Sequence, residues 1–293
     1  MNNLRPMLRS RIKSAVEYNM DDTLYRGYRY FSQSVGKKGL DGNWRKAFAT
    51  ELTRTAALVL GSLIHFVTLI PSQVQKYFAI GPNTDRRSKS GKEAWAEFEL
   101  TLNGRQVVTE AQMEIAENCR DAVLRHPSAR NLFDKSQKEV SYFWYDDESR
   151  LPMKARLDLV APKLVADLKS CADASPEGFG LQAARLHYGL QAAQYLDAVE
   201  ATTGTRPDAF LFLCVETQEP FSTGLWYVED GDDLVEAGKI LLRKSKLSLR
   251  RWLDTAPNER MEFYGDGKAQ KLECPPWYYR RIYENSVTKE IAR

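Results

Sequence analysis

Two carboxylates, Asp158 and Asp167, and the ammonium group of Lys169 lie close together in the apolar segment 155–169 of this 293-residue chain. Asp167 and Lys169 are two residues apart, so on a β-strand both side chains point to the same face. Asp158 ends the preceding apolar run, and an antiparallel turn at residues 161–163 would return it to the side of Asp167. Clustered carboxylates are costly without a cation between them, and Mg²⁺ binds carboxylate and phosphate oxygens together. The segment therefore predicts a phosphodiester-cleaving site.

The same residues have a simpler interpretation. An Asp and a Lys on a wet sheet face form at most a weak surface pair. The chemical interpretation therefore depends on groups elsewhere in the chain.

A long helix predicted over residues 176–203 supplies two such groups. Gln191 and Tyr195 are four residues apart and share one face, with His187 one turn earlier on the same stripe. The amide and the hydroxyl suit the binding of a phosphate or a water molecule. The alternative is that Gln191 and Tyr195 lie at the boundary of the core.

His65 and Glu139 are two further candidates. His65 lies in an apolar helical stretch, where a neutral imidazole would complete the shell of a cation, although a hydrogen-bonded core histidine is the commoner case. Glu139 comes just before the first predicted strand and would add a carboxylate at the same sheet edge.

The predicted elements run in the order helices, three strands, helix, two strands, helix. The apolar periodicity predicts helices over 44–74 (ending near Pro71), 92–102, 109–125, 176–203 and 232–253, and strands over 140–145, 153–160, 163–170, 208–216 and 225–228. A strand followed by a crossover helix and another strand favours a mixed α/β sheet. We expect three parts: an N-terminal arm or extension (1–45), a core (46–255) and an irregular C-terminal extension (256–293).

The composition is that of a globular protein, with 43% hydrophobic and 28% charged residues. A net charge of +3 is too small to indicate nucleic-acid binding by itself. Two clusters of basic residues are candidate contacts with a phosphate backbone, although a solvated surface is an equally good interpretation of each. They are Arg86, Arg87, Lys89 and Lys92, in or directly after a predicted loop over 81–91, and Arg243, Lys244, Lys246, Arg250 and Arg251, in the last helix.

The four cysteines are scattered without a Cys-x-x-Cys pair, which argues against a zinc or iron–sulfur site. We expect a reduced, cytoplasmic setting. The longest apolar stretch, residues 55–70, is too short to span a bilayer comfortably.

Taken in order, these motifs resemble a known family. The set Gly61-x-x-x-His65, Asp158, Asp167-Leu168-Lys169 and Gln191-x-x-x-Tyr195 resembles the RecB-like branch of the PD-(D/E)xK nucleases, and within it the exonuclease domain of the phage exonuclease VIII (RecE-type) proteins. The resemblance covers roughly residues 44–254. Leu157 stands where the family has proline, and Ser170 where it has threonine; neither change removes a catalytic group.

The resemblance implies a restriction-endonuclease-like α/β core, with a mixed central sheet flanked by helices and an N-terminal helical extension. It also implies that His65, Asp158, Asp167 and the Leu168 carbonyl are ligands of Mg²⁺, for which Mn²⁺ would substitute. Lys169 would orient the attacking water, and Gln191 and Tyr195 would brace the site.

The family resemblance further implies digestion of linear double-stranded DNA from its ends, in the 5′→3′ direction. Single strands would remain for a partner annealing protein in DNA recombination. The chain would then be a homo-oligomer, in some relatives a ring, in the cytoplasm of a bacterial or phage-infected cell.

Two other functions remain open from the sequence. A repair or restriction-type endonuclease would keep the same site and act on a different substrate. A non-catalytic nucleic-acid-binding or phage assembly protein would keep the fold alone, which gives no reason for clustered charges.

Overall fold

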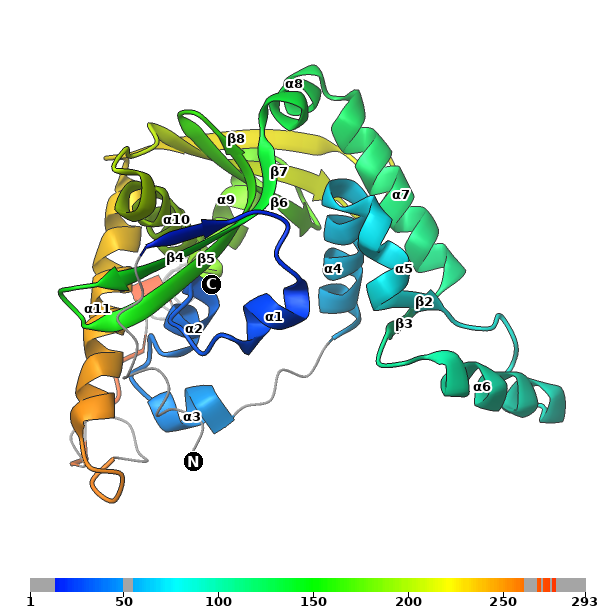
Figure 1. Cartoon of the computed structure of the whole chain (residues 1–293), viewed down its shortest axis with the longest axis horizontal. Coiled ribbons are helices and arrows are strands. Elements are labelled where there is room, and N and C mark those ends of the chain that lie inside the picture. The colour runs from blue at the N-terminus through cyan, green and yellow to red at the C-terminus, as the bar shows by residue number, and fades with distance from the viewer. Residues whose placement is uncertain (1–13, 50–54, 261–267, 270, 275, 278–293) are drawn as a thin grey trace, which may run out of the picture.

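A mixed six-stranded sheet organises the part of the chain that this computed structural model describes, namely residues 14–49, 55–260, 268, 269, 271–274, 276 and 277 (Figure 1). The strand order is β1-β4-β5-β6-β7-β8. The strands are β1 (Ala15–Glu17), β4 (Gln137–Asp146), β5 (Leu151–Ala161), β6 (Leu164–Cys171), β7 (Ala209–Glu216) and β8 (Thr223–Glu229). Helices lie on both faces, which confirms the predicted α/β class.

Antiparallel and parallel pairing divide the sheet. β4, β5 and β6 form an antiparallel meander, whereas β6 and β7 pair in parallel. A parallel pair needs a crossover connection. Here α9 (Pro176–Arg185) and α10 (Tyr188–Thr203) provide it. β8 then returns antiparallel to β7.

The central strands are apolar on both faces because helices cover each face. In β7, Phe210 and Phe212 pack with α10 and α11 (Asp233–Asp254), while Leu211 and Leu213 pack on the opposite side. That second layer consists of α4 (Ala56–Leu69), α7 (Glu110–Arg125) and α8 (Pro127–Lys135).

The first helical region is interrupted, unlike the continuous pattern predicted over 44–74. It contains α3 (Trp44–Ala49), α4, the 3-10 turn η2 (Pro71–Gln73) and α5 (Val74–Tyr77). Thr55 begins α4 by accepting a hydrogen bond from the Leu58 N–H. The end near Pro71 is as predicted.

The single helix predicted over 176–203 is wrong. The chain turns between α9 and α10 at His187, which has a left-handed backbone with φ of 51°. Periodicity continues across such a turn, so the apolar pattern alone does not reveal it. His187 is exposed and precedes α10 rather than extending the stripe of Gln191.

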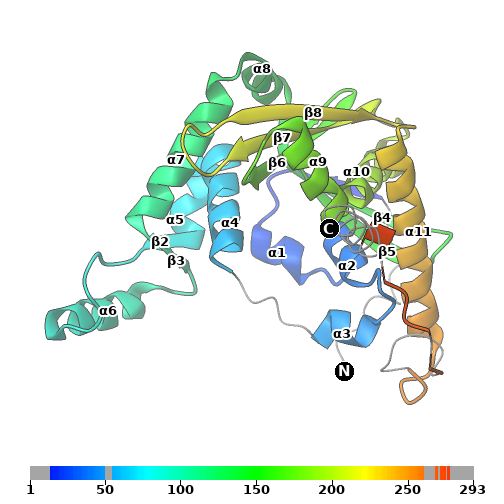
Figure 2. The same ribbon diagram turned by 180° about the vertical axis from the view of Figure 1, so that it is seen from behind.

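A small projecting unit joins α5 to α7. It consists of the parallel pair β2 (Phe78–Ile80) and β3 (Gln106–Val108), connected through α6 (Lys89–Thr101). Figures 1 and 2 show α6 standing away from the sheet, on the side opposite α11. Ser88 caps α6, so Lys89 lies on a helix and not in the predicted loop over 81–91, whereas Lys92 lies on a helix as predicted.

The N-terminal segment adds the edge strand β1 to the sheet and packs beside it. β1 pairs with β4, and Phe31 and Trp44 are each only 1% exposed. The segment also forms α1 (Asp22–Gly27) and α2 (Gln33–Lys38). The division into 1–45, 46–255 and 256–293 stays a prediction, and much of 256–293 lies outside the described residues.

None of the helices in the described ranges is long and apolar enough to cross a lipid bilayer.

Candidate functional site

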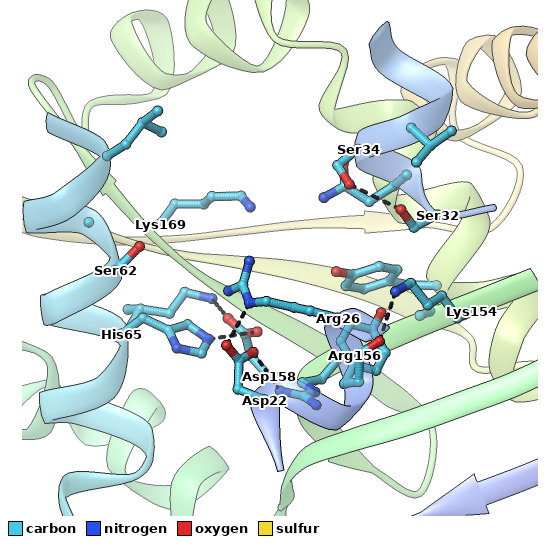
Figure 3. Close-up of a pocket in the computed structure, with 18 of the residues that line it drawn as sticks. Asp22, Arg26, Ser32, Ser34, Ser62, His65, Lys154, Arg156, Asp158 and Lys169 are labelled. Atoms are coloured by element: carbon cyan, nitrogen blue, oxygen red, sulfur yellow. Dashed lines mark hydrogen bonds and ion pairs between the residues drawn. The ribbon is translucent and has the colours of Figure 1, made fainter. Parts of the chain in front are cut away.

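A cleft of about 1010 Å³ opens beside β5 and β6 and brings most of the predicted site residues together. Its walls come from α1, α2 and α4 and from the junction of α9 with α10 (Figure 3). The charged residues that line it include His65, Glu139, Lys154, Arg156, Asp158 and Lys169. The cleft therefore joins segments that are far apart in the sequence.

His65, Glu139 and Asp158 converge at one end of this cleft. The His65 Nε2 atom lies 3.1 Å from an oxygen of each carboxylate, Asp158 Oδ1 and Glu139 Oε1. Ligand atoms of the three residues all lie within 4.8 Å of one another. This spacing allows one divalent cation to contact all three.

Asp158 and Asp167 approach through the β5–β6 hairpin, as predicted. The register pairs Leu159 with Ala166, which places the two aspartates opposite each other one residue further along. Asp158 Oδ2 accepts a hydrogen bond of 2.9 Å from the Leu168 N–H. Asp158 thus reaches His65 with one oxygen and β6 with the other.

Lys169 lies beside Asp167, also as predicted from their spacing. Its Nζ is 2.5 Å from Asp167 Oδ2 and donates to Gln191 Oε1 at 3.0 Å. The Gln191 amide donates to Asp167 Oδ1 at 2.6 Å, so one buried side chain of α10 holds both groups. Tyr195 is buried, interacts with Gln191 and lines the cleft.

Two buried oxygens fit the presence of a cation. Glu139 Oε1 is shielded from solvent and has no hydrogen bond, and Asp167 Oδ2 is equally shielded, with the Lys169 ammonium beside it. Glu139 Oε1 and Asp158 Oδ1 lie at the same 3.1 Å from the His65 Nε2 atom, which carries at most one hydrogen. Buried charges are normally paired or bind metals. The donor set of carboxylates and one imidazole suits a divalent cation.

Burial and neighbouring charges raise the pKa values of Asp167 and His65. Burial, followed by the neighbouring Asp158 charge, raises the pKa of Asp167 to about 6 against the opposing effect of Lys169. Burial would lower the pKa of His65, but Asp158 and Glu139 outweigh it and raise that pKa well above its usual value. Excess negative charge is therefore concentrated where the cation would bind.

Glu139 differs from its predicted place before the first strand. It lies inside β4, between the register pairs Lys138–Leu159 and Val140–Leu157, and hence opposite Asp158. Its backbone is left-handed, with φ of 53°, which is uncommon for a residue other than glycine. No spacing in the sequence indicates this pairing.

The two predicted DNA-binding clusters have different surroundings. Just before α6, Arg86 stacks over Trp95 of that helix and Arg87 pairs with Asp85. On α11, several of the basic groups are neutralised by acids, since Lys246 is 8% exposed and pairs with Asp146. The remaining α11 ion pairs of this cluster are Arg243 with Glu148 and Arg250 with Asp254. Lys246 is thus withdrawn from the surface, contrary to its predicted role.

Three residues of the site escaped the sequence analysis: Asp22, Lys154 and Arg156. Lys154 and Arg156 alternate with Asp158 along β5, so the strand period that identified Lys169 also places them on the face of Asp158. Asp22 contacts Arg156 from α1, 3.1 Å away, and no local pattern indicates that approach.

Comparison with known proteins supports the fold. No curated protein matches the chain. A crystal structure described as a candidate exonuclease from Eubacterium rectale aligns with a TM-score of 0.53 and 15% identity, over 90% of this chain and 98% of that one. At that identity the match supports the fold alone.

Two further structures align less well. SSO0001 has a TM-score of 0.30 and 14% identity, over 67% of this chain and 76% of that one. The Vibrio cholerae protein VC1899 has a TM-score of 0.22 and 13% identity, over 82% of this chain and 58% of that one. Neither carries an argument here.

A family model matches residues 32–250 and covers strands β4 to β8 and the whole cluster of His65, Glu139, Asp158, Asp167 and Lys169. That span is most of the chain, and it agrees with the mixed sheet and the acidic pair of the β5–β6 hairpin. The chain therefore belongs to the family of the PDDEXK-like domain of unknown function (DUF3799).

Proposed function

We propose that the chain is a divalent-metal-dependent deoxyribonuclease that hydrolyses phosphodiester bonds of linear double-stranded DNA from its ends. The observation that carries the proposal is the convergence of His65, Glu139 and Asp158 next to the Asp167–Lys169 pair. A cation site beside a fixed ammonium group, inside a nuclease-like fold, is what phosphodiester hydrolysis requires.

The chain's own residues divide the work as follows. His65, Glu139, Asp158 and Asp167 would hold Mg²⁺ or Mn²⁺, with the Leu168 carbonyl as a further ligand. When bound, the cation supplies positive charge to the phosphate and lowers the pKa of the attacking water. The Lys169 ammonium orients that water and stabilises the charge that develops on the phosphate. Gln191 keeps Lys169 and Asp167 in place through its two hydrogen bonds.

The finer parts of the proposal are the substrate and the direction. The E. rectale protein is described as a candidate exonuclease, which favours attack on chain ends. The resemblance of the sequence to exonuclease VIII adds double-stranded DNA as the substrate and 5′→3′ polarity. A homo-oligomer and a single-strand annealing partner belong to the same proposal. The basic residues around Arg86 on the α6 side are the candidate contacts with the duplex outside the cleft.

The decisive experiment compares linear with closed circular duplex DNA, each with Mg²⁺ and with chelator. We expect degradation of the linear form only, and only with the metal. Cleavage of the closed circle would identify an endonuclease on the same core. Binding without any cleavage would instead favour a non-catalytic nucleic-acid-binding protein.

Replacing the catalytic ammonium tests the mechanism. We expect Lys169→Ala to lower the turnover rate by a factor on the order of 10² to 10³, because a preorganised donor acts mainly on the transition state. Mn²⁺ binding and DNA binding should persist. Lys163→Gln is the control, since Lys163 lies on the surface at the hairpin turn and pairs with Asp208. Turnover retained in Lys169→Ala would contradict the assignment.

A further inference from the structure

Arg156 links the N-terminal segment to the cation site. Its Nη1 lies 3.1 Å from Asp22 Oδ1 and 3.9 Å from Glu139 Oε2. Its Nε donates to Ser141 Oγ at 3.1 Å, and its Nη2 donates to the carbonyls of Met20 and Asp21. The side chain is 12% exposed, so these contacts form in a largely dehydrated setting where ion pairs are strong.

The residue that Arg156 approaches has a backbone that needs support. Glu139 combines a buried carboxylate with a left-handed φ inside a strand. Such a conformation costs of order 1–3 kcal/mol and persists only where the surroundings overdetermine it. Ser141 faces Arg156 directly in the β4–β5 register and follows Glu139 on the same face of β4. Arg156 therefore holds the local strand and the carboxylate together.

A second cation of the same strand fixes α1 from its other end. The Lys154 ammonium donates to the carbonyls of Tyr25 and Tyr28, at 2.9 and 2.7 Å, where α1 ends. Both Lys154 and Arg156 also lie over the Tyr25 ring, at 4.4 and 4.1 Å from its centre. Lys154 and Arg156 thus clamp α1 at its two ends against β5.

The clamp also orients a cationic side chain in the cleft. Asp22 is shared, since it binds Arg156 with Oδ1 and Arg26 with Oδ2. Figure 3 shows Asp22, Arg26 and Arg156 meeting beside the His65–Asp158 pair. The order of contacts is Glu139, Arg156, Asp22, Arg26, and it runs from a candidate metal ligand to the open cleft.

We propose that Arg156 is a positioning residue, which holds Glu139 in its ligand geometry and couples that geometry to the docking of α1. This inference rests on the proposed function, because Glu139 is taken to bind the divalent cation. The inference goes beyond that function, because cation affinity then depends on Arg156, a side chain that does not contact the cation.

The charge of Arg156 and its positioning role predict opposite changes in cation affinity when Arg156 is replaced, which makes the inference testable. Removing a positive group near a cation site strengthens cation binding if only electrostatics matters. Removing a group that orients a ligand weakens metal binding, typically 10- to 100-fold. A loss of affinity on removal of Arg156 therefore reports position and not charge.

The experiment measures Mn²⁺ affinity by calorimetry on the full chain, without DNA. We expect Arg156→Gln to bind Mn²⁺ about tenfold or more weakly than the unsubstituted protein. Arg156→Lys should also lose affinity, because its ammonium cannot make the same set of contacts. Lys163→Gln, which removes an exposed positive charge at the far end of the hairpin, is the matched control and should stay within about twofold.

A double variant tests whether Arg156 acts through Glu139. If it does, Arg156→Gln combined with Glu139→Gln should bind Mn²⁺ no more weakly than Glu139→Gln alone. Additive losses would overturn the inference, as would unchanged or stronger Mn²⁺ binding in Arg156→Gln.

A neutral variant keeps the test decisive if the Arg156 variants do not fold. Ser141→Ala removes one hydrogen bond to Arg156 without changing any charge, and we expect a severalfold loss of Mn²⁺ affinity. Unchanged affinity in Ser141→Ala would then overturn the inference. Failure of the proposed function is distinct, because the unsubstituted protein itself would bind no Mn²⁺ or cleave no DNA.

Discussion

Asp167 is a buried carboxylate whose surroundings oppose its charge. It is 4% exposed and faces Asp158, and its Oδ2 atom lies beside the Lys169 ammonium. Lys169 and Gln191 compensate only in part, because burial and Asp158 still raise the pKa to about 6. Without a cation, the ionised site is therefore under electrostatic strain at neutral pH.

This strain predicts a pH-dependent gain in stability for Asp167→Asn in metal-free protein. The pKa of Asp167 in the folded protein lies above the ordinary aspartate value of 3.8, so the stability contributed by Asp167 is full at low pH and is lost as the pH rises from about 4 to 6. A shift of that size corresponds to about 3 kcal/mol. Chemical denaturation at pH 8 should show Asp167→Asn as the more stable protein by roughly that amount. The advantage should fade toward pH 4, and a less stable variant at pH 8 would contradict the assignment.

At the scale of elements, the turn between α9 and α10 decides where Gln191 and Tyr188 lie. Tyr188 begins α10, and its ring is 4.7 Å from the Lys169 ammonium. The turn depends on the left-handed backbone of the exposed His187. A residue outside the cleft thereby sets the position of the helix that holds Lys169.

Substitution of His187 should reveal this backbone requirement. We expect His187→Val to lower the free energy of unfolding by about 1–2 kcal/mol, since a β-branched side chain is poorly tolerated at positive φ. His187→Asn is the control and should stay near the unsubstituted protein, because asparagine visits this region readily. Equal stability of the two variants in denaturant unfolding would argue against a left-handed turn.

The projecting α6 unit is the second element with a testable role. Lys89 and Lys92 lie in its first turns, whereas much of the α11 cluster is paired with acids. If α6 contacts the DNA backbone, Lys89→Gln with Lys92→Gln should weaken duplex binding and reduce the salt slope by about one per lost phosphate contact. Lys163→Gln should leave the slope unchanged. An unaltered slope in the double variant would reject the role of α6.

At the scale of the whole molecule, the site connects the two halves of the chain. His65 belongs to the helical layer on one face, Asp158 and Asp167 to the sheet, and Asp22 to the N-terminal segment. A cation bound there would join these parts in the folded state and would have no equivalent partner set in the unfolded chain.

Cation binding should therefore stabilise the whole fold. With Mg²⁺ at about a hundred times its Kd, the free energy of unfolding should rise by about 2.7 kcal/mol. Thermal unfolding with Mg²⁺ and with chelator measures the effect. Asp158→Asn should abolish the response, because Asp158 contacts both His65 and β6. A melting temperature that does not change with Mg²⁺ in the unsubstituted protein would count against the cation site.

Local periodicity was enough to predict strands β4 to β8, the mixed sheet and the Asp158–Asp167–Lys169 group, but not the three-residue strands β1, β2 and β3. Those features depend on side chains two residues apart and on a short hairpin, so neighbours in sequence determine them. The Gln191 and Tyr195 positions followed from helical spacing in the same way. The break at His187 did not, because a single left-handed residue leaves the hydrophobic pattern almost unchanged.

The family resemblance named His65 with Asp158 and Asp167, but only the tertiary structure decided how distant groups meet in the site. His65 and Asp158 are 93 residues apart, and their 3.1 Å contact exists because α4 packs against β6. The β4–β5 register places Glu139 opposite Asp158. Arg156 contacts Asp22 only because α1 packs against β5. Such contacts follow from the packing of whole layers, which local spacing does not encode.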